Sequence, residues 1–394
     1  MKRKHRLTIC LLILLVIIPV FISGCWDSIE LNKLSIISGL GWDIDADTGQ
    51  LTLTFQSIIP SETKGAAGSS GDGGQKRGNP LHAIQLDSST GSSAYDALNR
   101  YSQHSSRRTF YQHTQLYILG RSAAEQGIYP FLDSIARNPI NRPNVLMVVS
   151  EKKARDILSI QDGMESIQAM GMAAEIKLSA EYSQYPVVTY LEFAQRLLSE
   201  TTAPLAPMVG IIEQTGPEGD RVQKTRISAT AVFKGDKMIG QLNEDESRGL
   251  LWAINKIKKG FLVIPGANLE IVTAKSKIIP ELQDEKIKIT IAIDEESNLL
   301  EYDGHREISS DLLQDLEKGQ AREIERQVMA AVEKSQALNA DVFGFGDTVH
   351  RKYKKEWPVL KARWEDIYPY IEVVVKVKTH VNEIGEINKA LMRD

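Results

Sequence analysis

Strands in the N-terminal half are predicted from alternating apolar and polar residues or from short apolar runs. Segments with these patterns lie at 35–45, 50–60, 114–119 and 145–149. The turn-rich segment 45–49 separates the first two, which together predict a β-hairpin. Apolar positions that recur every three or four residues predict helices at 95–103, 128–137, 164–180 and 187–199. The order strand, helix, strand within 114–149 predicts a βαβ-like crossover in a mixed sheet.

The second half follows a break at 201–207 that contains two prolines. Strands are predicted at 227–234, 237–242, 268–279, 286–293 and 370–380. We expect an antiparallel sheet to receive the last of these strands. Helices are predicted at 243–260, 309–337 and 348–357. The acidic segment 294–296 predicts a solvent-exposed turn.

The helix at 243–260 has the clearest end signals. Asn243 is a good N-cap residue, and Glu246 three positions later would complete a capping box. Lys256, Lys258 and Lys259 are expected in the last turn, where they would interact favourably with the helix dipole.

These elements predict an α+β (mixed α/β) fold with mixed or antiparallel sheets and packed helices. The division we expect is a leader at 1–24, an N-terminal α/β domain at 26–200, a middle α+β domain at 201–283 and a C-terminal α+β domain at 284–394. The Gly- and Ser-rich segment 65–78 is predicted to be a flexible loop. A phosphate-binding loop is the less favoured alternative, because the sequence G-x-x-x-x-G-K-[ST] is missing.

The leader has the features of a secretory signal peptide. Four basic residues precede an apolar run of 16 residues at 7–22, which is shorter than the roughly 18–20 residues of a membrane-spanning helix. Ser23 and Gly24 then precede Cys25, and this pattern resembles a bacterial lipobox. The resemblance implies cleavage after Gly24 and a diacylglyceryl group on the thiol of Cys25, which becomes the lipidated N-terminus. An ordinary signal peptide with a chance cysteine and an uncleaved anchor are the alternatives.

Composition narrows the class of protein. Apolar residues make up 42% of the 394 residues and charged residues 25%, as in an ordinary globular protein. The formal charge of −4 becomes about −8 without the four basic leader residues, which argues against a nucleic-acid partner. The two cysteines are Cys10 in the leader and Cys25, so we expect core packing and no disulfide to stabilise the mature chain. After Cys25, no apolar run is long enough to span a bilayer.

Two motifs invite a chemical interpretation. Asp43, Asp45 and Asp47 have the spacing of a calcium-binding loop, but threonines stand where such a loop needs glycine and glutamate, so a hairpin turn is favoured. Ser150 and Lys153 form the Ser-x-x-Lys motif of penicillin-binding enzymes, but the accompanying Ser-Asp-Asn and Lys-Thr-Gly motifs are missing. We therefore expect Ser150 to be the N-cap of a helix that includes Ala154.

The remaining candidate groups do not form a catalytic constellation. None of the seven histidines pairs with another at metal-ligand spacing, and no His-Glu-x-x-His, Cys-x-x-Cys or G-x-S-x-G motif occurs. We expect no catalytic residue, metal or cofactor. The basic segment 350–355 would face either solvent or anionic lipid headgroups. The residues thus indicate a tethered protein that acts by binding or assembly.

Two stretches of the chain resemble the Ger(x)C family of spore germination lipoproteins. Residues 24–31 (Gly-Cys-Trp-Asp-Ser-Ile-Glu-Leu) resemble the lipidation site and the adjoining mature sequence. Residues 336–346 (Gln-Ala-Leu-Asn-Ala-Asp-Val-Phe-Gly-Phe-Gly) resemble the C-terminal signature. Other matching positions, in order, are Gly39-Leu40-Gly41, His113, Ile118-Leu119-Gly120, Gly127-Ile128, Trp357-Pro358 and 373–377.

The resemblance implies a three-domain α/β subunit, the C subunit of a nutrient germinant receptor. It implies a location on the outer face of the spore inner membrane, beside integral-membrane A and B subunits, and it makes Cys25 the lipid site without supplying a catalytic residue. Segment 65–78 departs from the family pattern. The alternatives are an extracytoplasmic substrate-binding lipoprotein, a cell-wall enzyme acting through Ser150, and a purely structural lipoprotein.

Overall fold

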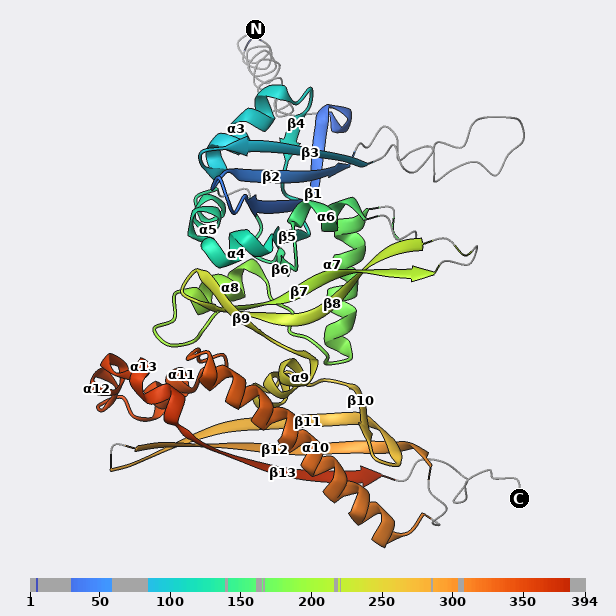
Figure 1. The fold of residues 1–394 in the computed structure, drawn as a ribbon, viewed down its shortest axis with the longest axis vertical. Helices are drawn as coiled ribbons and strands as arrows, with labels where there is room; N and C mark the ends of the chain where they lie inside the picture. The colour runs from blue at the N-terminus through green and yellow to red at the C-terminus, as the bar shows by residue number, and fades with distance from the viewer. Residues whose placement is uncertain are drawn as a thin grey trace.

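The computed structural model describes residues 30–58, 84–138, 141–160, 167–215, 221–284, 286–303 and 308–382, with residues 5, 165 and 219. Its elements build two β-sheets, one above the other along the long axis of the molecule (Figure 1). The predicted α+β fold with mixed sheets is confirmed. Within the described residues, no helix combines the length and the apolar character needed to cross a membrane.

The first sheet has nine strands in the order β3-β2-β1-β5-β6-β7-β8-β9, with β4 paired to β1. Their bounds are β1 Leu34–Ile44, β2 Leu51–Ile58, β3 Ile84–Gly91, β4 Arg108–Phe110, β5 Leu116–Leu119, β6 Leu146–Ser150, β7 Leu205–Thr215, β8 Arg221–Lys234 and β9 Lys237–Leu242. The central pairs β1–β5, β5–β6 and β6–β7 are parallel. The predicted β1–β2 hairpin and the crossover between β5 and β6 are confirmed.

Helices cover both faces of this sheet, as a parallel centre requires. They are α3 Ala94–His104, α4 Arg121–Gln126, α5 Tyr129–Ala136, α6 Ala154–Ser159, α7 Gln168–Glu181 and α8 Tyr190–Leu197. Residues on β5 and β6 alternate between two cores: Ile118 and Val148 face the core of α6 and α7, whereas Tyr117 and Met147 face the core that contains α5 and α8. The buried strands are therefore apolar on both faces.

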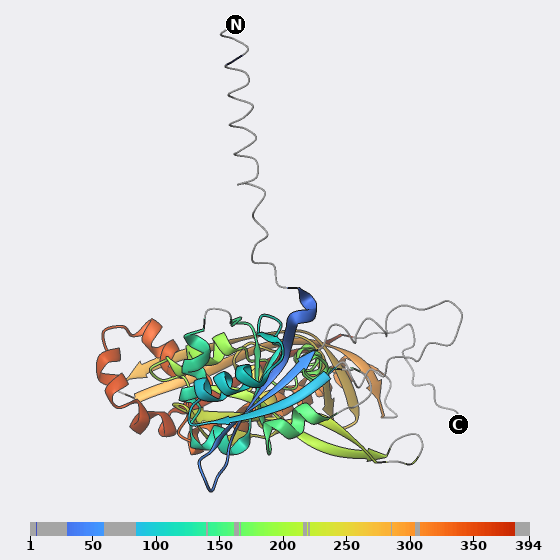
Figure 2. The same ribbon diagram turned by 90° about the horizontal axis from the view of Figure 1, so that it is seen from above.

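The second sheet has the order β10-β11-β12-β13. Its strands are β10 Gly260–Ile264, β11 Ala267–Gln283, β12 Lys286–Tyr302 and β13 Glu372–Asn382. The long helix α10 (Ser310–Ala337) confirms the helix predicted at 309–337 and lies along this sheet (Figure 1), with Ser309 as its N-cap. Between the sheets lies α9 (Glu244–Ala253), and α11 Phe345–Lys352, α12 Trp357–Ala362 and α13 Trp364–Ile367 gather at one end of the second sheet (Figure 2).

Three expectations about the second sheet and the helices beside it are wrong. β13 pairs with β12 in parallel, because helix α10 carries the chain back across the sheet between them, as a parallel pairing requires. Segment 294–296 is no turn but the middle of β12, where Glu295 is buried. The helix expected at 348–357 is two helices, since α11 ends at Lys352 and α12 begins at Trp357.

The capping box of α9 is confirmed, but its C-terminal end is not where the sequence predicts. Asn243 Oδ1 accepts a hydrogen bond from the backbone amide of Glu246, and the Glu246 carboxylate accepts one from the backbone amide of Asn243. The helix ends at Ala253, and Asn255 has a left-handed φ of 59°. The lysines expected in its last turn therefore lie in the following loop.

Sheet pairing continues across both positions at which we placed internal domain boundaries. β6 pairs with β7 across residue 200, and β11 pairs with β12 across residue 283. Pairing alone does not divide a chain into folding units, so the three-domain division stays a prediction. One apolar core includes residues from both sheets.

Candidate functional site

The family-like segment 339–346 forms the junction between the two sheets. Asp341 is buried at the N-terminus of α11, where its carboxylate accepts hydrogen bonds from the amides of Gly344 (2.8 Å), Phe345 (2.9 Å) and Gly346 (2.8 Å). Gly344 has a φ of 74°, which favours glycine. Burial raises the pKa of Asp341 to about 6, although these three hydrogen bonds oppose the rise.

The segment that leads into β7 forms the other side of this junction. Thr202 and Asp341 form a parallel β-bridge, and the amide of Ala203 donates to the carbonyl of Asp341 (2.8 Å). The carboxylate of Asp347 accepts from the hydroxyls of Thr202 (2.7 Å) and Ser199 (3.3 Å). Contacts between two segments about 140 residues apart in the sequence therefore connect the first sheet to the α11 region.

Arg196 of α8 adds a cation to this junction. Its Nη1 donates to the carbonyls of Ala203 (3.0 Å) and Val342 (3.1 Å), one on each side. Burial lowers the pKa of Arg196, and the nearby carboxylates of Asp341, Glu192 and Asp347 oppose the shift. Within the described residues, Arg196 forms no ion pair at salt-bridge distance.

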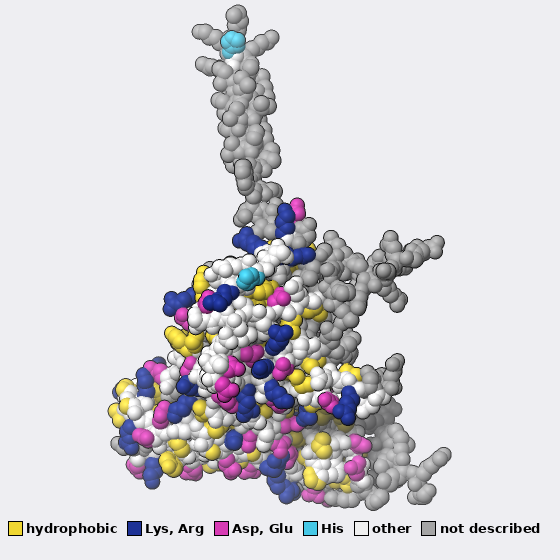
Figure 3. Space-filling model, turned by 45° about the horizontal axis from the view of Figure 1, so that its top comes forward, with side chains coloured by type: hydrophobic (Ala, Val, Ile, Leu, Met, Phe, Trp, Pro, Cys, Tyr) yellow, Lys and Arg dark blue, Asp and Glu magenta, His cyan; other side chains and the backbone are white. Residues whose placement is uncertain are grey.

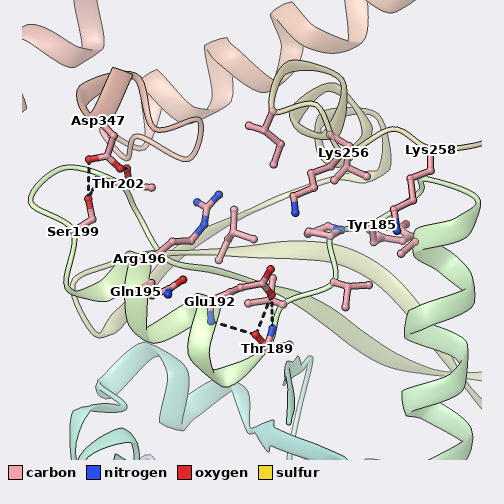
Figure 4. A pocket seen from close by; sticks show the side chains of 17 residues that line it. Tyr185, Thr189, Glu192, Gln195, Arg196, Ser199, Thr202, Lys256, Lys258 and Asp347 are labelled. Carbon is pink, nitrogen blue, oxygen red and sulfur yellow. Dashed lines mark hydrogen bonds between the residues drawn. The ribbon is translucent and has the colours of Figure 1, made fainter. Parts of the chain in front are cut away.

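A pocket of about 470 Å³ lies beside this junction, between α7, α8 and the loop after α9 (Figure 4). The Arg196 guanidinium and the Lys256 amino group both extend into it (Figure 4). Its lining residues are Ala180, Tyr185, Pro186, Val187, Val188, Thr189, Glu192, Gln195, Arg196, Ser199, Thr202, Leu205, Leu251, Ile254, Lys256, Lys258 and Asp347. The pocket has the size of a small-molecule site and lies where two sheets meet, a common place for such sites.

The structure does not support a nucleophile at Ser150. Its side chain is 1% exposed, and its hydroxyl donates to the carbonyl of Lys153 (3.0 Å) and accepts from the amide of Lys152. The prediction that Ser150 caps the next helix is also wrong. Asp43 instead accepts from the amides of Ala154 (2.8 Å) and Arg155 (3.2 Å), because the end of β1 lies beside the start of α6.

The three aspartates of the possible calcium loop are not brought together. Asp45 accepts from the amide (2.9 Å) and hydroxyl (2.8 Å) of Thr48 and thereby closes the hairpin turn, whereas Asp43 points to α6. In the parts of the chain that the structure describes, no group of three or more His, Cys, Asp and Glu side chains could hold a metal.

The basic segment 350–355 makes contacts within the protein. His350 stacks on Trp357, with 5.0 Å between ring centroids, and Lys352 Nζ donates to the carbonyl of Pro280 (2.7 Å). Figure 1 places α11 beside the second sheet, away from the end at which β1 begins. On the face seen in Figure 3, cationic and anionic side chains are interspersed, with no extended basic tract.

Sequence reasoning missed the pocket and Arg196. The pocket lining is spread over residues 180–347, and two of its residues, Lys256 and Lys258, lie in the loop after α9, which the sequence assigns to the helix. One available signal was the Thr189–Glu192 capping box, which fixes the start of α8 and hence the positions of Glu192 and Arg196. The lipid site expected at Cys25 and the loop expected at 65–78 lie outside the described residues.

Comparison with known proteins identifies two family domains. Residues 27–211 match the family described as "Spore germination protein N-terminal domain", and residues 228–385 match "Spore germination B3/ GerAC like, C-terminal". The chain is 27% identical to spore germination protein KC of Bacillus subtilis (strain 168) over 99% of this chain and 98% of that protein. It is 21% identical to spore germination protein GerQC of Bacillus cereus, over 95% and 98% of the two chains.

A solved structure shares the fold. The crystal structure of the GerBC protein superposes with a TM-score of 0.53 at 17% identity, covering 90% of this chain and 99% of that chain. At this identity the likeness concerns the fold alone. The matches in sequence and in fold both extend over most of the chain.

Proposed function

Because this chain belongs to the Ger(x)C family of spore germination proteins, we propose that it is the lipid-anchored C subunit of a nutrient germinant receptor. The observation that carries the proposal is the match of both family domains, in order, over residues 27–211 and 228–385. Relatives that are named as spore germination proteins align over nearly their whole length, so the proposal concerns both matched domains together.

The membrane attachment we propose is a diacylglyceryl group on Cys25. The described body begins at Glu30, five residues later, so an extended linker reaches at most about 18 Å from Cys25 to the body. The lipid would therefore hold the end of the molecule that carries the start of β1 close to the bilayer. Two acyl chains anchor a protein stably, whereas one gives marginal binding.

The role we propose is assembly without catalysis. Confinement to the membrane plane raises the effective concentration of the chain for integral-membrane A and B subunits. The buried state of Ser150 and the lack of a metal-binding group among the described residues give no support to a cell-wall enzyme. The chain would act on the outer face of the spore inner membrane and contribute to the trigger for germination.

Membrane retention tests this proposal. In spores, the Cys25→Ala chain is expected to leave the membrane fraction and the wild-type chain to stay in it. Cys10→Ala is the matched control, because it changes the only other cysteine, which lies within the expected leader. Retention of the Cys25→Ala chain at the wild-type level, with no lipid detected by mass spectrometry on the wild-type N-terminus, would contradict the proposed anchor.

A further inference from the structure

We propose that the pocket between α7, α8 and the loop after α9 binds a small organic carboxylate that carries an aliphatic body. This ligand site goes beyond the proposed role in a receptor and does not depend on the lipid or on partner subunits. The charges, the hydrogen bonds and the apolar wall of the pocket support it.

The cations of the pocket have unused donors. Arg196 uses only Nη1 for the carbonyls of Ala203 and Val342; its Nε and Nη2 have no hydrogen-bond partner among the described residues. The amino groups of Lys256 and Lys258 likewise have no ion-pair or hydrogen-bond partner in the described part of the chain. A guanidinium with free donors at the wall of a pocket matches the planar geometry of a carboxylate.

The acids of the pocket are already engaged. Glu192 Oε2 accepts from the amide (2.9 Å) and hydroxyl (3.0 Å) of Thr189, and Asp347 accepts from Ser199 and Thr202. Three cations against two carboxylates leave the lining with one net positive charge. This balance favours a monoanion over phosphate, whose second charge would face the two carboxylates without a matching cation.

The rest of the wall is suited to an aliphatic body. The apolar part of the lining consists of Ala180, Pro186, Val187, Val188, Leu205, Leu251 and Ile254. A volume of about 470 Å³ holds a short branched chain together with its carboxylate and a few waters. Burial of the chain would supply affinity, and the cations would orient the carboxylate.

Equilibrium dialysis of radiolabelled 4-methylpentanoate against the full-length chain in a non-ionic detergent tests the proposal, with empty micelles as the blank. We expect saturable binding to one site, weakened by added salt because the cations are partly exposed. The neutral isostere 4-methylpentanamide is expected to bind at least about tenfold more weakly, as loss of a charge-assisted contact implies. Inorganic phosphate is expected to bind at least about tenfold more weakly as well, because it lacks the aliphatic body and its second charge would face the two carboxylates. Binding of either probe as tight as that of 4-methylpentanoate would overturn the assignment, as would lack of saturable binding.

Variants locate the site. Lys256→Gln combined with Lys258→Gln is expected to weaken binding at least about tenfold, because both amino groups are lost while their backbone contacts remain. Lys259→Gln is the matched control in the same loop; it does not line the pocket and should change affinity less than about twofold. Equal affinity of the double variant and wild type, or equal weakening by Lys259→Gln, would refute the site.

A second variant fills the pocket without changing charge. Ala180→Leu adds an aliphatic side chain at a half-buried position of α7 that lines the pocket, and should abolish binding by occupying the apolar part of the lining. Arg196 is left intact, since its substitution would also remove the two contacts of the junction. Undiminished binding by Ala180→Leu would contradict the proposal. Because binding is measured on the isolated chain, its failure is distinguishable from failure of the membrane anchor.

Discussion

The contact between Gly346 and Thr201 offers a direct test of the junction between the sheets. A Cβ atom on Gly346 would lie 2.3 Å from Oγ1, 2.7 Å from Cβ and 3.0 Å from Cγ2 of Thr201. Carbon atoms pack at about 3.5–4.0 Å, and a rotamer change moves Oγ1 and Cγ2 but not Cβ, so the backbone at Thr201 must shift by about 1 Å. The neighbouring residue Thr202 is fixed by its bridge to Asp341 and its hydrogen bond to Asp347.

Gly346→Ala is therefore expected to reduce the free energy of unfolding by about 2–3 kcal/mol, in the upper part of the usual range for overpacking. Urea unfolding followed by tryptophan fluorescence measures the change, since Trp357 and Trp364 lie in the adjoining helices. Gly319→Ala in α10 is the matched control, because its nearest neighbour is the flexible end of Ile264 at 3.4 Å.

A second substitution should rescue the first. Thr201→Gly removes all three clashing atoms, and the Thr201 hydroxyl is buried without a partner among the described residues, so no hydrogen bond is lost. Thr201→Gly alone should cost up to about 1 kcal/mol in backbone entropy. The double variant should be about 1–2 kcal/mol more stable than the sum of the two single effects predicts. Wild-type stability of Gly346→Ala, or strictly additive effects, would refute this account of the junction.

Two further predictions concern the packing of α10. Burial, followed by the charge of Glu296, raises the pKa of Glu295 to about 8. Since a carboxyl with a raised folded-state pKa favours folding while it is protonated, stability should fall as pH rises from about 4.5 to about 8. Glu295→Gln should reduce this dependence of stability on pH, measured as the urea midpoint across the same pH range. An unchanged dependence on pH would contradict the prediction. In addition, a Cβ on Gly249 would lie 1.9 Å from the carbonyl oxygen of Gln327, so Gly249→Ala should force α9 and α10 apart and cost about 3 kcal/mol, measured by urea unfolding against Gly319→Ala. A loss below 1 kcal/mol would show that the helices can separate freely.

Local sequence signals predicted the elements that local interactions determine. The β1–β2 hairpin follows from alternation and a turn closed by Asp45 itself, and the α9 capping box involves residues three positions apart. The long helix α10 follows from the periodicity of its apolar residues. Each of these signals is contained within a few turns of chain, so no tertiary information was needed.

Other elements depend on partners distant in the sequence. The charged segment 294–296 was predicted as a turn, yet β12 continues through it, because β11 and β13 pair on either side and Gln320 of α10 donates to Glu295 (2.6 Å). The cap of α6 came from Asp43, more than 100 residues earlier. No pattern near residue 150 carries that information, so a serine with good local propensity was assigned the role instead.

The candidate site likewise has one part that the sequence indicates and one part that it does not. Segment 339–346 was identified through its resemblance to a family, and the structure adds a physical reason: Asp341, Gly344 and Gly346 fit a carboxylate that accepts from three consecutive amides. The pocket could not be predicted, because its cations come from α8 and from a loop that the sequence assigned to a helix.

The proposed function makes this chain a working subunit of a nutrient germinant receptor. The most direct measurement is nutrient-by-nutrient germination of spores that lack the chain, complemented with the wild-type, Cys25→Ala or Cys10→Ala form. We expect deletion to abolish or slow the response to at least one nutrient, with recovery by the wild-type and Cys10→Ala forms but not by Cys25→Ala. Germination of the deletion spores at the wild-type rate with every nutrient would contradict the claim.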